Sequence, residues 1–245
     1  MFKKTLIAAT VAACTSFVGF GASAATKDVD LLFVIDSSGS MGAEFTTLAN
    51  NIESFFNLLT SDSRTGSVAG GLVSFLGTPT LQQAITTDVN ALKTAINSVP
   101  VSGGTENGLD ALEAGLPGGS LFSDIAWRNN TVKSFILITD EDDDGAENYA
   151  AVGAAINGAG YLNNIIVSGG GSEYGPSAVP SGGVFSLTDF TSNPTTFFTA
   201  FAAAKLGEIE DTDTTPGAVP LPASVPLLLT GVGLISALRL RRKET

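Results

Sequence analysis

Residues 33–42 read FVIDSSGSMG, and they join an apolar run to a loop of hydroxyl groups and glycines. The run begins at Asp30 and ends on Asp36, which is typical of a buried strand that stops at a carboxylate. Asp36, Ser38 and Ser40 then follow two residues apart, so a turning loop can direct all three side chains toward one point. The glycines between and after them let the backbone bend closely around that point. The alternative for this loop is a helix N-cap, because aspartate and serine cap helices well.

The rest of the chain alternates between strand-like and helix-like patterns. We predict strands at 30–36, 67–75, 80–86, 132–139, 164–168 and 184–187, and helices at 45–59, 89–99, 109–116, 149–159 and 194–209. This alternation predicts an α/β fold with a doubly wound, mostly parallel central sheet and helices on both faces, in which 80–86 forms an edge hairpin. Ligands of such sheets bind beyond the carboxyl ends of the strands.

The composition excludes several chemistries. The 245 residues include no histidine and one cysteine, Cys14, so Ser-His-Asp catalysis, Cys-His catalysis, histidine- or thiolate-based zinc sites and internal disulfides are excluded. Acidic residues number 24 against 12 basic ones, and 23 of the acidic but only 6 of the basic residues lie between Ala25 and Thr215. Such a surface repels phosphate backbones, so we expect no nucleic-acid partner. Any bound metal needs oxygen ligands, which favours magnesium, manganese or calcium.

The two ends of the chain read as sorting signals. Residues 1–24 have a basic start, an apolar run and a small-residue cleavage site, and they predict a secretory signal peptide. We predict one domain at 25–209, a polar linker at 210–218 and a hydrophobic C-terminal helix within 219–245. The basic cluster after that helix favours the cytoplasmic side, which leaves the domain outside.

The tail from Val219 to Lys243 contains VPLPA, an apolar helix and an arginine cluster in that order. It resembles the PEP-CTERM class of bacterial sorting signals in its VPLPA variant; the alternative is a plain membrane anchor. The resemblance implies handling by an exosortase-type membrane protease and transient or permanent anchoring in the inner membrane. It also implies delivery to the cell surface or extracellular matrix of a Gram-negative bacterium.

The domain also resembles a known family. FVIDSSGSMG is similar to the signature of von Willebrand factor A domains, in which Asp-x-Ser-x-Ser forms a metal ion-dependent adhesion site. The family pattern continues with a threonine in a glycine-rich loop, which SGGTENGLDALEAG supplies as Thr105. It ends with an aspartate after the central strand, which FILITD supplies as Asp140. The resemblance covers about Val29 to Leu206.

This resemblance implies a set of metal ligands. Ser38, Ser40 and Thr105 would bind Mg²⁺ or Mn²⁺ directly, and Asp36 and Asp140 would act mainly through bound waters. One coordination position would stay open for the acidic group of a protein or polysaccharide ligand.

Residues 137–148, LITDEDDDGAEN, place four further carboxylates directly after Asp140. Our hypothesis is a second cation, Ca²⁺, held by Asp142, Asp144 and Glu147. The alternative is a solvated acidic turn at the start of a helix, where the helix dipole favours negative charge.

The sequence therefore predicts a non-enzymatic, exported surface or matrix adhesion module that binds its ligand through a divalent cation. Two alternatives stay open: a magnesium-dependent phosphatase-like enzyme that uses Asp140 and Asp142, and a purely structural matrix component. We expect the only tryptophan, Trp127, to pack against a helix rather than form part of a recognition surface.

Overall fold

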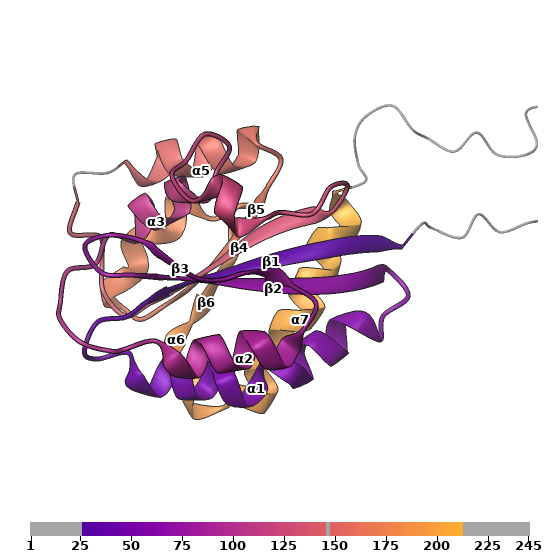
Figure 1. The fold of residues 1–245 in the computed structure, drawn as a ribbon, viewed down its shortest axis with the longest axis horizontal. Coiled ribbons are helices and arrows are strands. Elements are labelled where there is room, and N and C mark those ends of the chain that lie inside the picture. Colours follow the sequence, from indigo (N-terminus) through magenta and orange to yellow (C-terminus); the bar gives the residue numbers. More distant parts are fainter. Residues whose placement is uncertain (1–25, 146–147, 213–245) are drawn as a thin grey trace, which may run out of the picture.

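A six-stranded sheet with the order β3-β2-β1-β4-β5-β6 forms the centre of the computed structural model, which describes residues 26–145 and 148–212 (Figure 1). The strands are β1 (Lys27–Asp36), β2 (Thr65–Phe75), β3 (Thr80–Thr86), β4 (Val132–Thr139), β5 (Leu162–Val167) and β6 (Val184–Ser186). All neighbours are parallel except β3, which runs antiparallel to β2 at one edge. The predicted mostly parallel sheet and its edge hairpin are confirmed.

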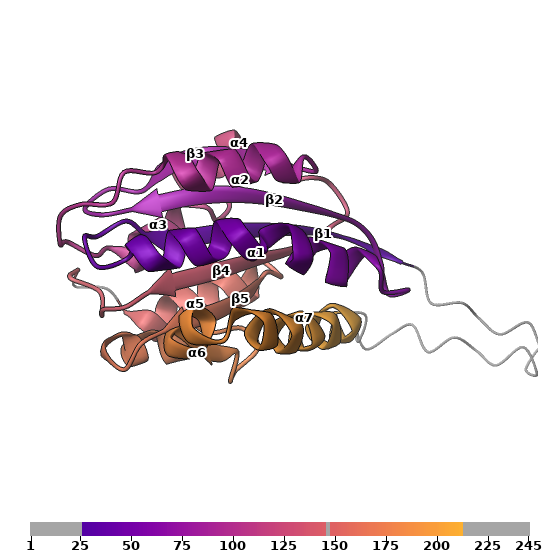
Figure 2. The same cartoon turned by 90° about the horizontal axis from the view of Figure 1, so that it is seen from below.

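Helices cover both faces of this sheet (Figures 1 and 2). They are α1 (Gly42–Thr60), α2 (Val89–Ser98), α3 (Gly108–Ala114), α4 (Phe122–Ile125), α5 (Tyr149–Gly158), α6 (Leu187–Ser192) and α7 (Pro194–Asp211), with a 3₁₀ helix at Gly170–Ser177. Helices α1, α2, α6 and α7 pack on one face, and α3 and α5 pack on the other. The doubly wound arrangement is therefore confirmed.

Strand β1 lies between two apolar clusters because its side chains alternate between the faces of the sheet. Leu31, Phe33 and Ile35 join the cluster under α1 and α7, whereas Leu32 and Val34 join the cluster under α3 and α5. A central parallel strand is buried on both faces, which explains its continuous apolar sequence. This burial fixes β1, and with it the position of the loop that follows it.

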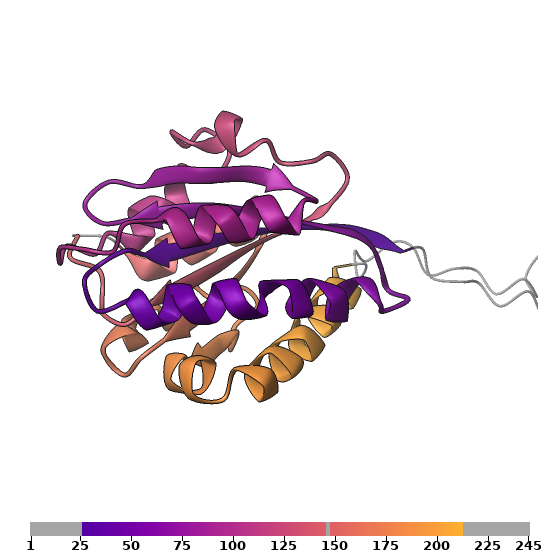
Figure 3. The same cartoon turned by 60° about the horizontal axis from the view of Figure 1, so that its bottom comes forward.

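Helices α1 and α7 lie alongside each other beneath the sheet (Figure 3). Phe55 of α1 stacks on Phe201 of α7 with ring centroids 5.4 Å apart, and Phe198 contacts the same ring at 5.6 Å. Aromatic pairs of this kind contribute about 0.5–1.5 kcal/mol beyond their buried area. All residues of the two buried apolar clusters lie within 29–209. The described part of the chain is therefore expected to fold on its own.

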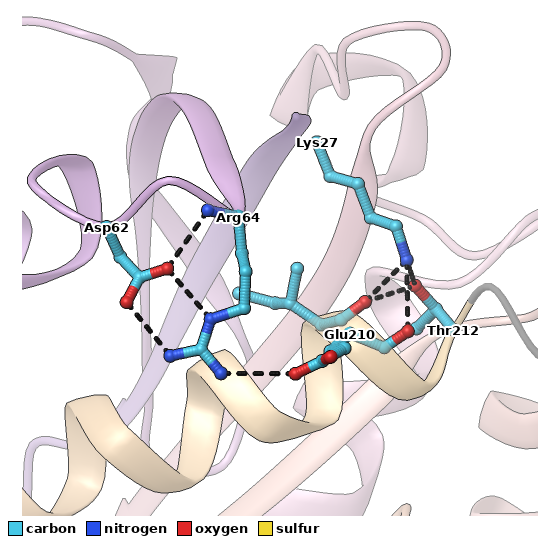
Figure 4. Close-up of polar contacts among 6 residues, drawn as sticks. Lys27, Asp62, Arg64, Glu210 and Thr212 are labelled. Carbon is cyan, nitrogen blue, oxygen red and sulfur yellow. Dashed lines mark hydrogen bonds and ion pairs between the residues drawn. The ribbon is translucent and has the colours of Figure 1, made fainter. Parts of the chain in front are cut away.

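The beginning of β1 and the end of α7 meet at the end of the sheet opposite the strand carboxyl ends (Figure 4). Lys27 Nζ donates to the carbonyl oxygen of Ile209 at 2.6 Å and to Thr212 Oγ1 at 2.8 Å. Arg64 pairs with Asp62 at 2.8 Å and with Glu210 at 3.3 Å. Helix α7 runs on to Asp211, so it includes the first two residues of the stretch that we predicted as a linker.

Several predictions differ in detail from the structure. Strand β5 begins at Leu162, two residues before the prediction, and α6 was not predicted as a separate helix. Trp127 is half-buried and packs edge-on to Phe135 and Tyr161, while its Nε1 donates to the carbonyl oxygen of Gly115, directly after α3. The predicted signal peptide, most of the linker and the C-terminal sorting segment lie outside the described residues. Within 26–145 and 148–212, no helix has the length and apolar character needed to span a membrane.

Candidate metal centre

The loop after β1 brings the first three predicted metal ligands together. Asp36 is fully buried at the end of β1, and its Oδ1 accepts a hydrogen bond from the Ser38 backbone N–H at 2.7 Å. Its Oδ2 accepts one from Thr139 Oγ1 at 3.1 Å, while the hydroxyls of Ser38 and Ser40 lie 3.2 Å apart. Helix α1 begins later, at Gly42, with no side-chain cap. The loop therefore gathers oxygens rather than capping the helix.

The loop that carries Thr105 lies directly against this first loop. The Gly39 N–H donates to the carbonyl oxygen of Gly103 at 3.0 Å, and the Ser102 N–H donates to that of Ser37 at 2.9 Å. Gly103 has a φ of 90°, a left-handed conformation that glycine adopts without strain. Thr105 is exposed two residues later, at the same end of the sheet.

Asp140 completes the predicted set from the neighbouring strand. It follows β4, which pairs in parallel with β1 so that Ile35 lies opposite Ile138. Burial raises the pKa of Asp36, and the nearby charge of Asp140 raises it further. The Oδ1 atom of Asp140 is buried and has no hydrogen-bond partner. The structure therefore places all five predicted residues on three adjoining loops.

Two further carboxylates face this centre, and the sequence pattern did not single them out. Glu44 lies in the first turn of α1; burial and the charges of Asp140 and Asp36 raise its pKa, and its Oε2 is buried without a partner. Glu106 is only 3% exposed. Burial, together with the charges of Asp36, Glu141 and Asp144, raises the pKa of Glu106 to about 7. Only tertiary folding brings these side chains to the site.

These residues fit a divalent cation. Buried carboxylates that repel each other need a cation or a proton, and no lysine or arginine contributes to the shifted pKa values of Asp36, Glu44 and Glu106. In the described part of the chain, no three acidic, histidine or cysteine side chains are grouped closely enough to hold a metal by themselves. The serine and threonine hydroxyls are therefore needed, and an all-oxygen donor set suits Mg²⁺, Mn²⁺ or Ca²⁺.

The raised pKa of Glu106 predicts a pH dependence of stability without metal. Its pKa is raised from 4.5 to about 7 on folding, so the folded domain retains the proton over this range while the unfolded chain releases it. Stability from this group is therefore lost as the pH rises from 4.5 to 7. In EDTA, we expect Glu106→Gln to melt like wild type near pH 4.5 and about 4 °C higher near pH 7.5.

The control is Glu113→Gln, an exposed glutamate on α3. Melting curves should show no pH-dependent difference between this control and wild type. A Glu106→Gln domain that loses stability as the pH rises, relative to wild type, would contradict the assignment of Glu106 as an uncompensated buried acid.

Glu44 predicts a change in cation affinity. Its unpartnered Oε2 adds negative charge to the site, and affinity of oxygen sites for divalent cations rises with the charge of the surrounding ligands. We expect Glu44→Gln to weaken cation binding about tenfold in calorimetry, without lowering the melting temperature in EDTA. Glu53→Gln, on the exposed side of the same helix, should bind like wild type. Equal affinities for both variants would exclude Glu44 from the site.

The acidic run after β4 has a structural role that the sequence did not indicate. Asp143 Oδ2 accepts hydrogen bonds from the Leu109 N–H at 2.8 Å and from Tyr174 Oη at 3.1 Å. Asp144 Oδ2 accepts one from the Glu106 N–H at 3.0 Å, and the Asp144 N–H donates to the Glu106 carbonyl oxygen at 2.8 Å. The run therefore ties the Thr105 loop and the start of α3 to β4.

The second cation site stays a hypothesis. Asp142 and Asp144 are exposed, and Asp144 already accepts a backbone hydrogen bond. Glu147, the third predicted ligand, lies outside the described residues.

Comparisons with known proteins agree with this architecture. The chain matches the family model described as von Willebrand factor type A domain over residues 30–206. None of the curated protein sequences matches the chain.

Several solved structures share the fold. Proximal thread matrix protein 1 from the mussel byssus is 19% identical with a TM-score of 0.57 in a structure described as having a zinc-occupied MIDAS motif. This similarity covers 75% of the chain but 47% of the mussel protein, so the chain spans about half the length of that protein. The vWF domain of the pilus tip protein Mfa5 from Porphyromonas gingivalis is 14% identical with a TM-score of 0.53, covering 81% of the chain and all of that domain. BatB from Bacteroides thetaiotaomicron is 17% identical with a TM-score of 0.52, covering 76% of the chain and all of BatB.

Proposed function

The chain belongs to the von Willebrand factor type A domain family, and from that premise we propose that it is an exported, non-enzymatic adhesion module that binds its partner through a divalent cation. The observation that carries this proposal is the convergence of Asp36, Ser38 and Ser40 with the Thr105 loop and Asp140 at one end of the sheet. Hydroxyl ligands leave a bound cation with residual positive charge. The cation then attracts an oxygen atom from outside the protein.

The proposed roles are those that the family resemblance implies for these positions. Ser38, Ser40 and Thr105 hold the cation through their hydroxyls, and Asp36 and Asp140 add charge and fix bound waters. Asp36 also holds the loop in place, because it accepts the Ser38 backbone N–H while Thr139 fixes its other oxygen. The partner supplies an acidic group from a protein or polysaccharide to the position left open on the cation. We propose Mg²⁺ or Mn²⁺ as the cation.

The proposed location is the cell surface or extracellular matrix of a Gram-negative bacterium. It rests on the signal-peptide pattern at 1–24 and on the VPLPA-type tail, which together favour export, processing by an exosortase-type protease and anchoring in the inner membrane. Two solved structures of the same fold come from a byssal matrix protein and a pilus tip protein, and this setting agrees with an extracellular role.

Competition with free carboxylate tests the function. The domain, immobilised with Mg²⁺, should retain a partner from a panel of extracellular proteins and polysaccharides, and millimolar acetate or EDTA should release it. A structural matrix component would melt at a higher temperature with the metal, but acetate would release nothing from it. Hydrolysis of a generic phosphate ester that is lost in Asp140→Asn would favour the phosphatase alternative and contradict the proposal.

A further inference from the structure

The basic side chains of the described residues are absent from one end of the domain, whereas acidic side chains lie at both ends. All the basic residues of 26–145 and 148–212 lie away from the loops that carry the candidate metal ligands. Lys27 and Lys133 lie near the starts of β1 and β4, and Arg64 lies just before β2. Arg128 forms an ion pair with Asp30 of β1, and Lys205 donates a hydrogen bond to Ser134 of β4. Lys93 lies in the middle of α2. Because these three strands are parallel, their starts share one end of the sheet.

The opposite end carries a surface that we call the acidic rim, formed by the exposed residues Glu141, Asp142, Asp144 and Glu173. Two of these carboxylates border the candidate metal centre, because Glu141 directly follows Asp140 and Asp144 is hydrogen-bonded to the backbone of Glu106, next to Thr105. Asp142 lies between them in the chain, and Glu173 lies on the 3₁₀ helix, whose Gly171 is close to the carbonyl oxygen of Glu141. Four carboxylates lie further inside, on Asp36, Glu44, Glu106 and Asp140. One divalent cation offsets only part of this charge.

This excess of negative charge around the candidate metal centre restricts the kind of partner that can bind there. A carboxylate that approaches the cation also approaches the rim, and like charges within a Debye length of about 8–10 Å repel. A chain of closely spaced carboxylates would meet this repulsion at every unit. A carboxylate with lysine or arginine beside it would bind the cation and place its positive groups on the rim, so that the potentials match across the interface.

We propose that the partner of this site is a protein segment in which an aspartate or glutamate is flanked by basic residues, and not a polyuronate polysaccharide. This inference rests on the proposed cation-dependent function and narrows its partner class. Rim carboxylates mainly set the charge preference, while the cation and the partner carboxylate provide the anchor. Specificity then comes from charge complementarity more than from a shaped pocket.

The test uses capped nine-residue peptides with identical glycine-serine frames, added to the ¹⁵N-labelled domain in Mg²⁺. The central aspartate is flanked by two lysines in one peptide and by two serines in another. A third peptide keeps the lysines but has alanine at the centre, and polygalacturonate serves as the polyuronate. We expect the lysine-flanked aspartate to bind at least tenfold more tightly than the serine-flanked one, with the difference shrinking in 0.5 M NaCl.

Rim variants provide the matched controls. Glu141→Gln/Asp142→Asn should reduce the lysine preference to threefold or less, whereas Glu53→Gln/Glu113→Gln, at exposed positions on α1 and α3, should preserve it. Equal or tighter binding of polygalacturonate or of the serine-flanked peptide would overturn the proposed partner class. So would equal binding of the alanine peptide, because that would indicate simple ion exchange. Failure of the wild-type domain to bind any divalent cation in calorimetry would instead remove the proposed function itself.

Discussion

Arg128→Ala is expected to destabilise the domain by about 3–5 kcal/mol, because it leaves a fully buried carboxylate without its positively charged partner. Asp30 has no exposed side-chain surface, and it accepts hydrogen bonds from Arg128 Nε at 2.5 Å and from the Arg128 N–H at 2.7 Å. The same guanidinium donates to Ser67 Oγ and to the Val29 carbonyl oxygen. Arg128 therefore joins the starts of β1 and β2 to the segment before β4.

Thermal melts measure this effect against a matched arginine. Arg64 pairs with Asp62 and Glu210 on the surface, and exposed ion pairs contribute at most about 1 kcal/mol. Arg128→Ala should lower the melting temperature by about 10 °C and Arg64→Ala by about 3 °C or less. Adding Asp30→Asn to Arg128→Ala should recover part of the loss. If the Arg128→Ala and Arg64→Ala variants have the same melting temperature, the ion pair at Asp30 is not what stabilises this end of the sheet.

Asp36→Asn is expected to weaken divalent cation binding at least a hundredfold, which corresponds to about 2.7 kcal/mol. The asparagine keeps the shape of the side chain but removes the negative charge at the end of β1. The asparagine oxygen can still accept the Ser38 N–H, and its NH₂ group can donate to Thr139 Oγ1, so the hydrogen bonds of the loop are kept while the charge is lost. Calorimetry with Mg²⁺, Mn²⁺ and Ca²⁺ measures the change.

The same experiment separates lost binding from lost folding. Burial raises the pKa of Asp36, so the charge there disfavours the metal-free fold, and Asp36→Asn should melt no lower than wild type in EDTA. Asp62→Asn, at the far end of the sheet, should bind cations like wild type. An Asp36→Asn domain that still binds with near wild-type affinity would remove Asp36 from the site.

The sequence predicted the features that depend on local patterns. The bounds of β4 agree with the prediction, since an apolar run between polar residues marks a strand buried on both faces. The order of strands and helices then placed the loops after β1 and β4 at one end of the sheet. The loop contacts at Gly39 and Ser102 bring the Thr105 segment to the same place.

The features that the sequence did not predict depend on contacts between distant segments. Helix α3 has no side-chain cap of its own, and carboxylates from beyond β4 accept the backbone N–H groups of Glu106 and Leu109 instead. Rules based on neighbouring residues cannot find such capping, so the sequence suggested only a second cation or a solvated acidic turn for this run. Glu44 and Glu106 each follow a recognised motif by a few residues, and only the fold shows that both face the candidate metal centre.

Titration of the wild-type domain and a Ser38→Ala/Ser40→Ala variant with Mg²⁺, Mn²⁺ and Ca²⁺ tests the central claim most directly. Residues 25–215 contain the complete core and suit calorimetry. We predict that the wild type binds a divalent cation and that the variant does not, although both melt at similar temperatures in EDTA. Equal binding by both proteins would place the cation elsewhere, with the carboxylates of 140–144 as the first place to look, and would contradict the proposed adhesion site.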